Sequence, residues 1–126
     1  MGELLTLTKP TSVSVSTLAG YRVRSPQNED LGTIEEIIIH PDSGRVTYAV
    51  LCFGGTVGFG DRLFAVPWDL LRLDAADRVL ILDWDHGKLD GAPAFDQDDW
   101  PDFTDENWER EIQNYYGLRK VNPAGL

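Results

Sequence analysis

The residue types that most often carry chemistry are few in this chain and poorly spaced for it. Its two histidines, His40 and His86, are far apart in the sequence, so no pair at hairpin or helical spacing is available to hold zinc. The Ser and Thr residues near the N-terminus have no His and acid beside them, which leaves a hydrolytic triad without a basis. Catalysis would depend on Asp and Glu alone, and we expect no enzyme activity and no catalytic residue.

An acidic run in the last third of the chain is the next candidate for chemistry. It contains five aspartates, Asp96, Asp98, Asp99, Asp102 and Asp105. A calcium loop of the EF-hand type would need a glycine after the third acid and a distant bidentate glutamate, and both are missing. The run therefore predicts a solvated acidic loop, and we expect no bound metal.

A glycine corner joins two apolar segments in the middle of the chain. Its glycines are Gly54, Gly55, Gly58 and Gly60, and the segment that follows ends in Pro67 and Trp68. The order G-x-x-G-x-G is not that of a dinucleotide-binding loop, and no helix follows to hold a phosphate. The corner predicts a structural turn between strands rather than a cofactor site. A small-ligand site in the mouth of the fold near residues 54–61 is the alternative, which an interior filled by Phe53, Phe64 and the isoleucines would exclude.

The charge of the chain is concentrated near its C-terminal end. The whole sequence has 21 acidic and 11 basic residues, and the segment 83–111 contains eleven of the acids but only Lys88 and Arg110 as bases. Because phosphate binding needs clustered Lys and Arg, we expect no direct contact with nucleic acid. The acidic segment predicts either a solvated face or a surface for a basic protein partner.

Length and cysteine content place the chain among small intracellular domains. The 126 residues are enough for one domain with its own core. The single Cys52 lies in an apolar run and predicts a small buried side chain. No segment has the length of apolar sequence that a membrane span needs, and we expect a cytoplasmic protein without membrane insertion. Residues 1–15 predict a leader that is either mobile or adds an edge strand.

The elements that must position these residues are short strands. Alternating or β-branched apolar runs separated by turn residues predict about six of them. The expected strands are 18–24, 31–40, 45–53, 63–67, 72–73 and 78–83, with a helical turn at 68–71. Pro41-Asp42-Ser43-Gly44 has the composition of a type I turn ended by a left-handed glycine, and predicts a hairpin. The fold class is therefore all-β, a small barrel or sandwich over residues 16–84.

The last part of the chain, residues 85–126, predicts an acidic and aromatic extension. Thr104 is a suitable N-cap and Gly117 a suitable stop, so we expect a helix over residues 105–116. Four apolar residues fall on one side of it and could pack on the barrel or on a partner: Trp108, Ile112, Tyr115 and Tyr116. Together with Trp100 they are our candidate interaction residues.

Several of these motifs resemble one family. Leu31-Gly32-Thr33-Ile34-Glu35, the 41–45 hairpin and Phe64-Ala65-Val66-Pro67-Trp68 resemble the PRC-barrel domain, and the extension resembles that of small stand-alone bacterial members. This resemblance implies a small β-barrel, as found in the photosynthetic reaction centre H subunit and in a ribosomal small-subunit maturation factor, that docks proteins and has no catalytic residue. We therefore expect a non-enzymatic interaction module that forms a homodimer.

Overall fold

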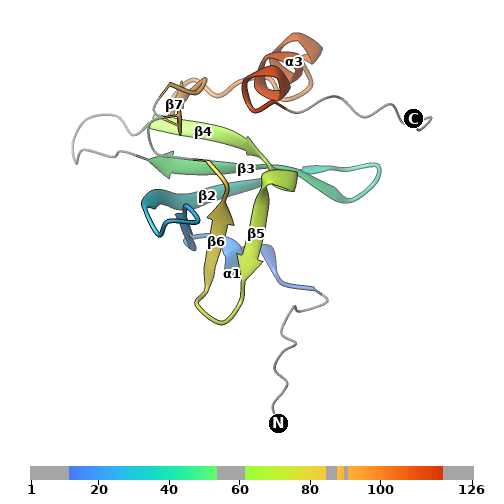
Figure 1. Ribbon diagram of the computed structural model, residues 1–126. Coiled ribbons are helices and arrows are strands. Elements are labelled where there is room, and N and C mark those ends of the chain that lie inside the picture. Colours follow the sequence, from blue (N-terminus) through green and yellow to red (C-terminus); the bar gives the residue numbers. More distant parts are fainter. Residues whose placement is uncertain (1–11, 54–61, 85–87, 90, 118–126) are drawn as a thin grey trace.

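Seven strands form one mixed sheet in the computed structural model, and a helix follows them near the C-terminus (Figure 1). The structure describes residues 12–53, 62–84, 88–89 and 91–117. The strands are β1 (Arg22–Arg24), β2 (Asp30–His40), β3 (Arg45–Phe53), β4 (Arg62–Pro67), β5 (Leu71–Asp74), β6 (Val79–Leu82) and β7 (Phe95–Asp96). The helices are α1 (Val15–Leu18), the 3-10 turn η2 (Trp68–Leu70) and α3 (Glu106–Tyr115). The expected mainly β fold class is confirmed.

The sheet has the strand order β5-β6-β1-β2-β3-β4-β7, which leaves β5 and β7 at its two borders. All neighbours are antiparallel except β1 and β6, where Arg22 lies beside Val79 in a parallel register. Strands β5 and β6 run steeply across the direction of β3 and β4, so the sheet is strongly curled (Figure 1). Register shifts in β1 and β2 contribute to this curl, because a bulge increases local twist.

The long β2–β3 hairpin depends on two glycines. Gly44 closes the turn in the left-handed region, at φ +75°, and its N–H donates to the His40 carbonyl at 2.7 Å, as the turn composition predicted. Gly32 lies where β2 passes close to β3, at φ +113°, and a Cβ there would be 2.2 Å from the Cys52 carbonyl oxygen. Only glycine fits that crossing.

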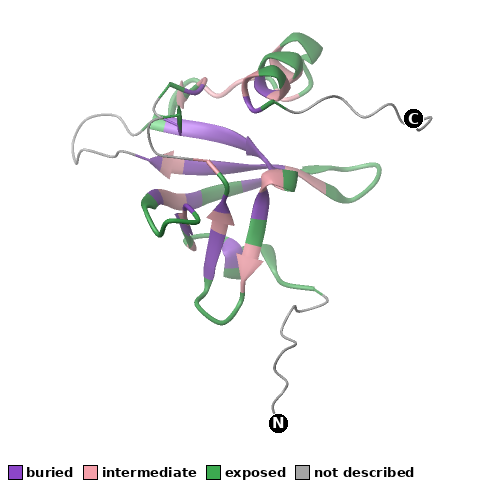
Figure 2. Ribbon diagram, viewed as in Figure 1, coloured by how far each residue is buried: buried purple, intermediate pink, exposed green. Residues whose placement is uncertain are grey.

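Strands β3, β4 and β6 carry long buried segments (Figure 2), and the buried side chains are mostly aliphatic. Phe53 and Phe64 fill the centre of this core, with ring centroids 6.1 Å apart and Phe64 fully buried. Ile34 is also buried beside them in the same cluster. These side chains occupy the interior that a small ligand would need, which argues against the ligand alternative.

The strand expected over residues 18–24 is wrong in its first half. Residues up to Leu18 form α1 instead, because the Ser14 hydroxyl accepts a hydrogen bond from the Thr17 N–H at 3.2 Å and caps a short helix. Gly20, at φ +89°, then turns the chain into the sheet, and its N–H donates to the Ile34 carbonyl. Only Arg22–Arg24 remains as β1.

Two further expectations are corrected at the C-terminal end. The count of about six strands missed β7, a two-residue strand that pairs with Arg62 and Leu63 of β4. The N-cap of α3 is Asp105, which accepts from the Asn107 N–H at 2.9 Å, because the Thr104 hydroxyl is already bonded to Asp102. Gly117 ends the helix in the left-handed region, at φ +73°, as predicted.

Some expectations fall on positions that the structure does not describe. The glycine corner Gly54, Gly55, Gly58 and Gly60, the first eleven residues of the leader and His86 all lie outside the described residues. Of the residues assigned to the corner, Pro67 is buried at the end of β4 and Trp68 is partly buried at the start of η2. No helix among the described residues is long and apolar enough to cross a membrane.

Candidate protein-interaction surface

The extension is attached to the sheet by the apolar side of α3. Ile112 and Tyr116 are 1% and 3% exposed, respectively, and belong to the same core cluster as the strands. Trp108 and Tyr115 are partly buried against that cluster. The helix lies over β4 (Figure 1), so the predicted stripe packs on the chain's own sheet and leaves Ile112 and Tyr116 almost no surface for a partner.

A series of aromatic rings continues this contact along the extension. Trp108 packs edge-on against Tyr48 of β3, with centroids 5.2 Å apart, and against Phe103 at 5.1 Å. Trp100 packs on Phe95 at 5.1 Å and donates its indole N–H to the Gln97 carbonyl at 2.8 Å. Trp100 is therefore held within the extension while part of its surface stays exposed.

The two adjacent tyrosines at the end of α3 are in different hydrogen-bonding situations. The Tyr115 hydroxyl donates to the Lys88 carbonyl, which ties the helix to the chain that leaves the sheet. The Tyr116 hydroxyl is buried and has no hydrogen-bond partner among the described residues, and its ring packs against Trp84 at a centroid distance of 5.1 Å. Burial raises the pKa of Tyr116 well above its usual value.

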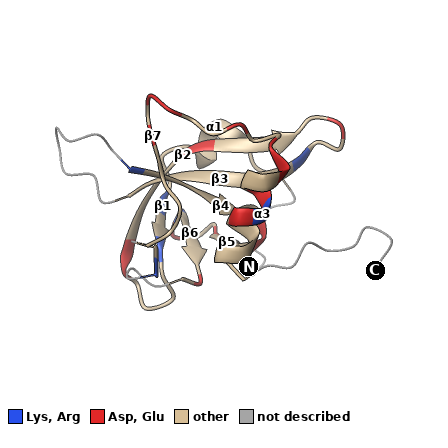
Figure 3. Cartoon of the chain, turned by 90° about the horizontal axis from the view of Figure 1, so that it is seen from above, with Lys and Arg blue, Asp and Glu red and all other residues tan. Residues whose placement is uncertain are grey.

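The outer side of the extension is acidic. Of its acids within the described ranges, all but the partly buried Glu109 are exposed: Asp96, Asp98, Asp99, Asp102, Asp105, Glu106 and Glu111. Figure 3 shows acidic positions on α3 and on the chain that leads to it. Hydrogen bonds from the hydroxyl and the backbone N–H of Thr104 lower the pKa of Asp102. This face therefore presents mainly exposed carboxyl groups to a partner.

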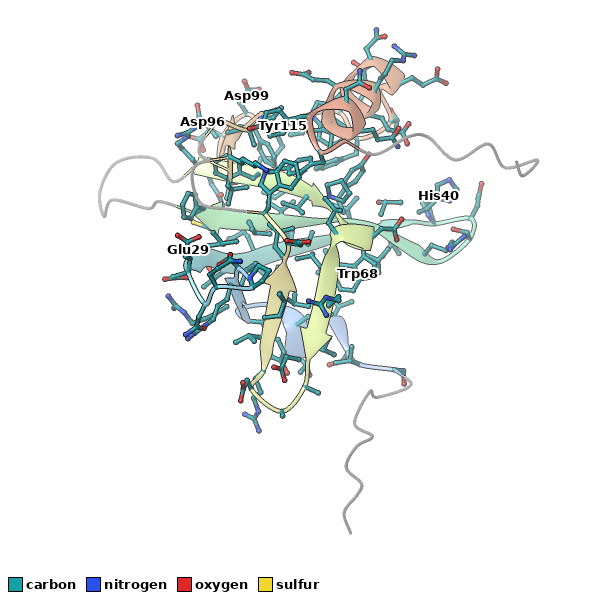
Figure 4. The ribbon with its side chains drawn as sticks, in the orientation of Figure 1. Glu29, His40, Trp68, Asp96, Asp99 and Tyr115 are labelled. Carbon is teal, nitrogen blue, oxygen red and sulfur yellow. The ribbon has the colours of Figure 1, made fainter. Side chains whose placement is uncertain are left out.

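A groove of about 820 Å³ lies where the extension meets the β2–β3 hairpin and η2. Tyr48, Pro67 and Trp68 give it aromatic and apolar lining, while His40, Ser43, Arg45, Val46, Thr47, Asp69, Glu109 and Gln113 complete it. Burial and the nearby Glu109 carboxylate raise the pKa of Tyr48 to about 12, so its hydroxyl stays protonated. Figure 4 shows His40 and Trp68 on different elements, away from Asp96 and Asp99.

The groove is lined by residues that no pattern in the sequence places together. Trp68 was assigned to the glycine corner and His40 was considered only as a zinc ligand, yet both line the same groove as Glu109 of α3. The signal that could have linked them is the amphipathic pattern of the helix, because a helix packed on β4 must pass over the end of β3. Among the described residues, no group of three or more His, Cys, Asp or Glu side chains is placed to hold a metal ion.

The observed architecture is that of a small mainly β domain with a helical extension packed on one border of its sheet. Residues 10–89 match the family model of the PRC-barrel domain, and because this match covers more than half of the chain, the chain belongs to the PRC-barrel family. This domain is typically a non-catalytic module.

One solved structure similar to this chain is a 16S ribosomal RNA processing protein, RimM, from Pseudomonas aeruginosa, at 20% sequence identity. The match covers 64% of this chain and 48% of that chain, with a TM-score of 0.42, so the chain spans about half the length of that protein. No curated protein matches the chain.

Proposed function

We propose that this chain is a non-enzymatic protein-interaction module that assembles protein complexes, and that one of its partners is a second copy of itself. Membership of the PRC-barrel family supports a role without catalysis. The proposal also agrees with the acidic groups of the extension, because they are mostly exposed and solvated rather than gathered in a cleft with a partner base.

The observation that carries the proposal is that the extension buries its apolar side on the sheet and exposes its acidic side. Its apolar stripe is used within the chain, where Ile112 is buried against the sheet. What remains outside is an acidic face and a groove lined by Tyr48 and Trp68. Partly exposed aromatic side chains beside charged groups are the usual anchors of protein interfaces, and we assign Trp100 and Trp108 to this role.

The mass of the protein in solution tests the self-association. We expect size-exclusion chromatography with light scattering to give a mass that rises from 14.1 kDa toward twice that value as concentration increases. A mass that stays at 14.1 kDa over the whole concentration range would contradict self-association.

A Trp100→Ala variant tests the extension as the surface for other partners. Trp100 is partly exposed and packs only on its own extension in the described contacts, so the variant is expected to keep the sheet intact. We expect the variant to capture fewer proteins from a bacterial lysate than the wild-type chain does. An unchanged set of captured proteins would remove Trp100 from the interaction surface. Asn114→Ala, at an exposed position of α3, is the matched control.

A further inference from the structure

Strand β5 is a border of the sheet, because β6 is the one strand that pairs with it in the described part of the chain. It pairs with β6 from Leu71 to Asp74, and no other described strand lies beside it. Beyond that pairing, its one described backbone bond is the helix-ending contact of the Leu71 N–H with the Trp68 carbonyl. A strand at a border presents a row of backbone donors and acceptors that a further strand can bind.

The side chains of β5 alternate between the two faces of the sheet. Leu71 is buried and Leu73 packs on the core, so both point inward. Arg72 is exposed and Asp74 is partly exposed on the other face. Within the described ranges, Arg72 has no carboxylate within ion-pairing distance. One oxygen of Asp74 accepts from the Asp77 N–H at 3.2 Å, which leaves its second oxygen available.

We infer that β5 pairs with the β5 strand of a second copy, antiparallel and centred on Leu73, so that the two sheets join into one. This inference rests on the proposed self-association and names its surface. In this register Leu73 faces Leu73 of the second copy, and Arg72 faces its Asp74. Because a two-fold axis relates the copies, the Arg72–Asp74 pair forms twice.

The charges of β5 select this register among its neighbours. A slip by one residue would place the apolar face of one sheet beside the solvent face of the other. A slip by two residues would place Arg72 opposite Arg72, or Asp74 opposite Asp74, and like charges directly opposite each other are destabilising. Only the register centred on Leu73 gives opposite charges on both flanks and keeps the leucines on the core side.

The opposite border of the sheet is not available in the same way. There β7 pairs with β4 at Arg62 and Leu63, and α3 lies over β4. The free length of β5 is four residues, so the contact is small and we expect a weak dimer. Mass should therefore be measured up to about 1 mM protein, where weak association becomes visible.

Charge reversal on the wild-type background tests the register. In Arg72→Asp both pairs become Asp opposite Asp, and in Asp74→Arg both become Arg opposite Arg. We expect each variant alone to dimerise roughly 10- to 100-fold more weakly than the wild-type chain. An equimolar mixture of the two variants should recover the wild-type mass, because every pair in the mixed dimer is again Asp opposite Arg. The double variant carrying both changes should also recover it.

Arg110→Asp is the matched control, since it makes the same charge change at an exposed position of α3, and it is expected to leave the mass unchanged. Circular dichroism of each variant checks that it is folded. Asp74→Asn keeps an oxygen for the Asp77 N–H, so it separates the effect of losing the charge from the effect of losing the turn hydrogen bond.

A dimeric wild type whose single variants remain dimeric overturns β5 pairing but leaves the proposed self-association standing. A mass reduced by Arg110→Asp and not by Arg72→Asp moves the contact to the extension and overturns the inference. A monomeric wild type overturns both.

Discussion

The two borders of the sheet differ in how far other parts of the described chain cover them. At the β4 border, a two-residue strand and a helix with a fully buried isoleucine cover the edge, and aromatic rings from Tyr48 to Trp108 fix the cover in place. At the β5 border, four residues end the sheet without a described neighbour beyond β6. The first border is held by many side-chain contacts, and at the second no described strand pairs with the outer side of β5.

The comparison indicates that the extension has a structural role, which is independent of any role in binding a partner. It closes the border at which a partner strand would otherwise add, and its exposed side carries acids that a second acidic chain would repel. The proposed self-association would therefore use the short β5 border, where the outward charges, Arg72 and Asp74, are of both signs. Each of the following changes separates the two borders experimentally.

Ile112→Ala has the largest expected effect. Removing most of a side chain that is 1% exposed between α3 and the sheet should lower the free energy of unfolding by about 3 kcal/mol. Chemical denaturation measures this change. Arg72→Ala, at the exposed β5 border, should change the free energy of unfolding by less than about 0.5 kcal/mol. If the Ile112 variant were as stable as the Arg72 variant, the helix would not cover the β4 border.

The pair of tyrosines at the end of α3 gives an intermediate effect of opposite sign. Tyr115→Phe removes the hydroxyl that donates to the Lys88 carbonyl and should destabilise the fold by about 1 kcal/mol. Tyr116→Phe removes a buried hydroxyl that has no partner within the described ranges, so the fold should be equally stable or more stable. Thermal unfolding of both variants compares them directly. Equal losses in the two variants would be inconsistent with these hydrogen-bonding assignments.

The narrowest expected effect is the alkaline pH dependence of stability, because it is confined to pH values above 10. The pKa of Tyr48 is raised from 10.0 to about 12, so the unfolded chain loses this proton at lower pH than the folded chain does. The contribution of Tyr48 is therefore fully present below pH 10 and is lost as the pH rises from 10 to about 12. Tyr48→Phe should make denaturation curves depend less on pH over that range. An unchanged pH dependence in the variant would show that the hydroxyl is not protected by the cover.

Much of the sheet could be predicted from the sequence because its signals are local. The 41–44 turn composition, the β-branched run of β3 and the glycine at the end of α3 each act within a few residues. β7 could not be predicted, since two residues become a strand only when β4 is beside them. The short α1 was missed because a single Ser14 cap competes with a weak strand pattern.

The candidate surfaces were less predictable for the same physical reason. The amphipathic pattern of α3 indicated a buried stripe, but it could not decide between the chain's own sheet and a partner, and the structure places Ile112 on the sheet. Nothing in the sequence singles out Arg72 and Asp74 as interface residues. They become candidates only because β5 is a border of the sheet, which the strand order shows.

Amide hydrogen exchange at the two borders, measured as a function of protein concentration, tests the central claim most directly. Alternate amides of β5 point away from β6, and those without a partner within the described chain should exchange freely in dilute protein, unlike the Leu71 N–H, which is bonded to the Trp68 carbonyl. We predict that their protection rises over the same concentration range in which the mass doubles, while the amides of β4 stay unchanged. A mass that doubles with no change in β5 exchange would contradict the account.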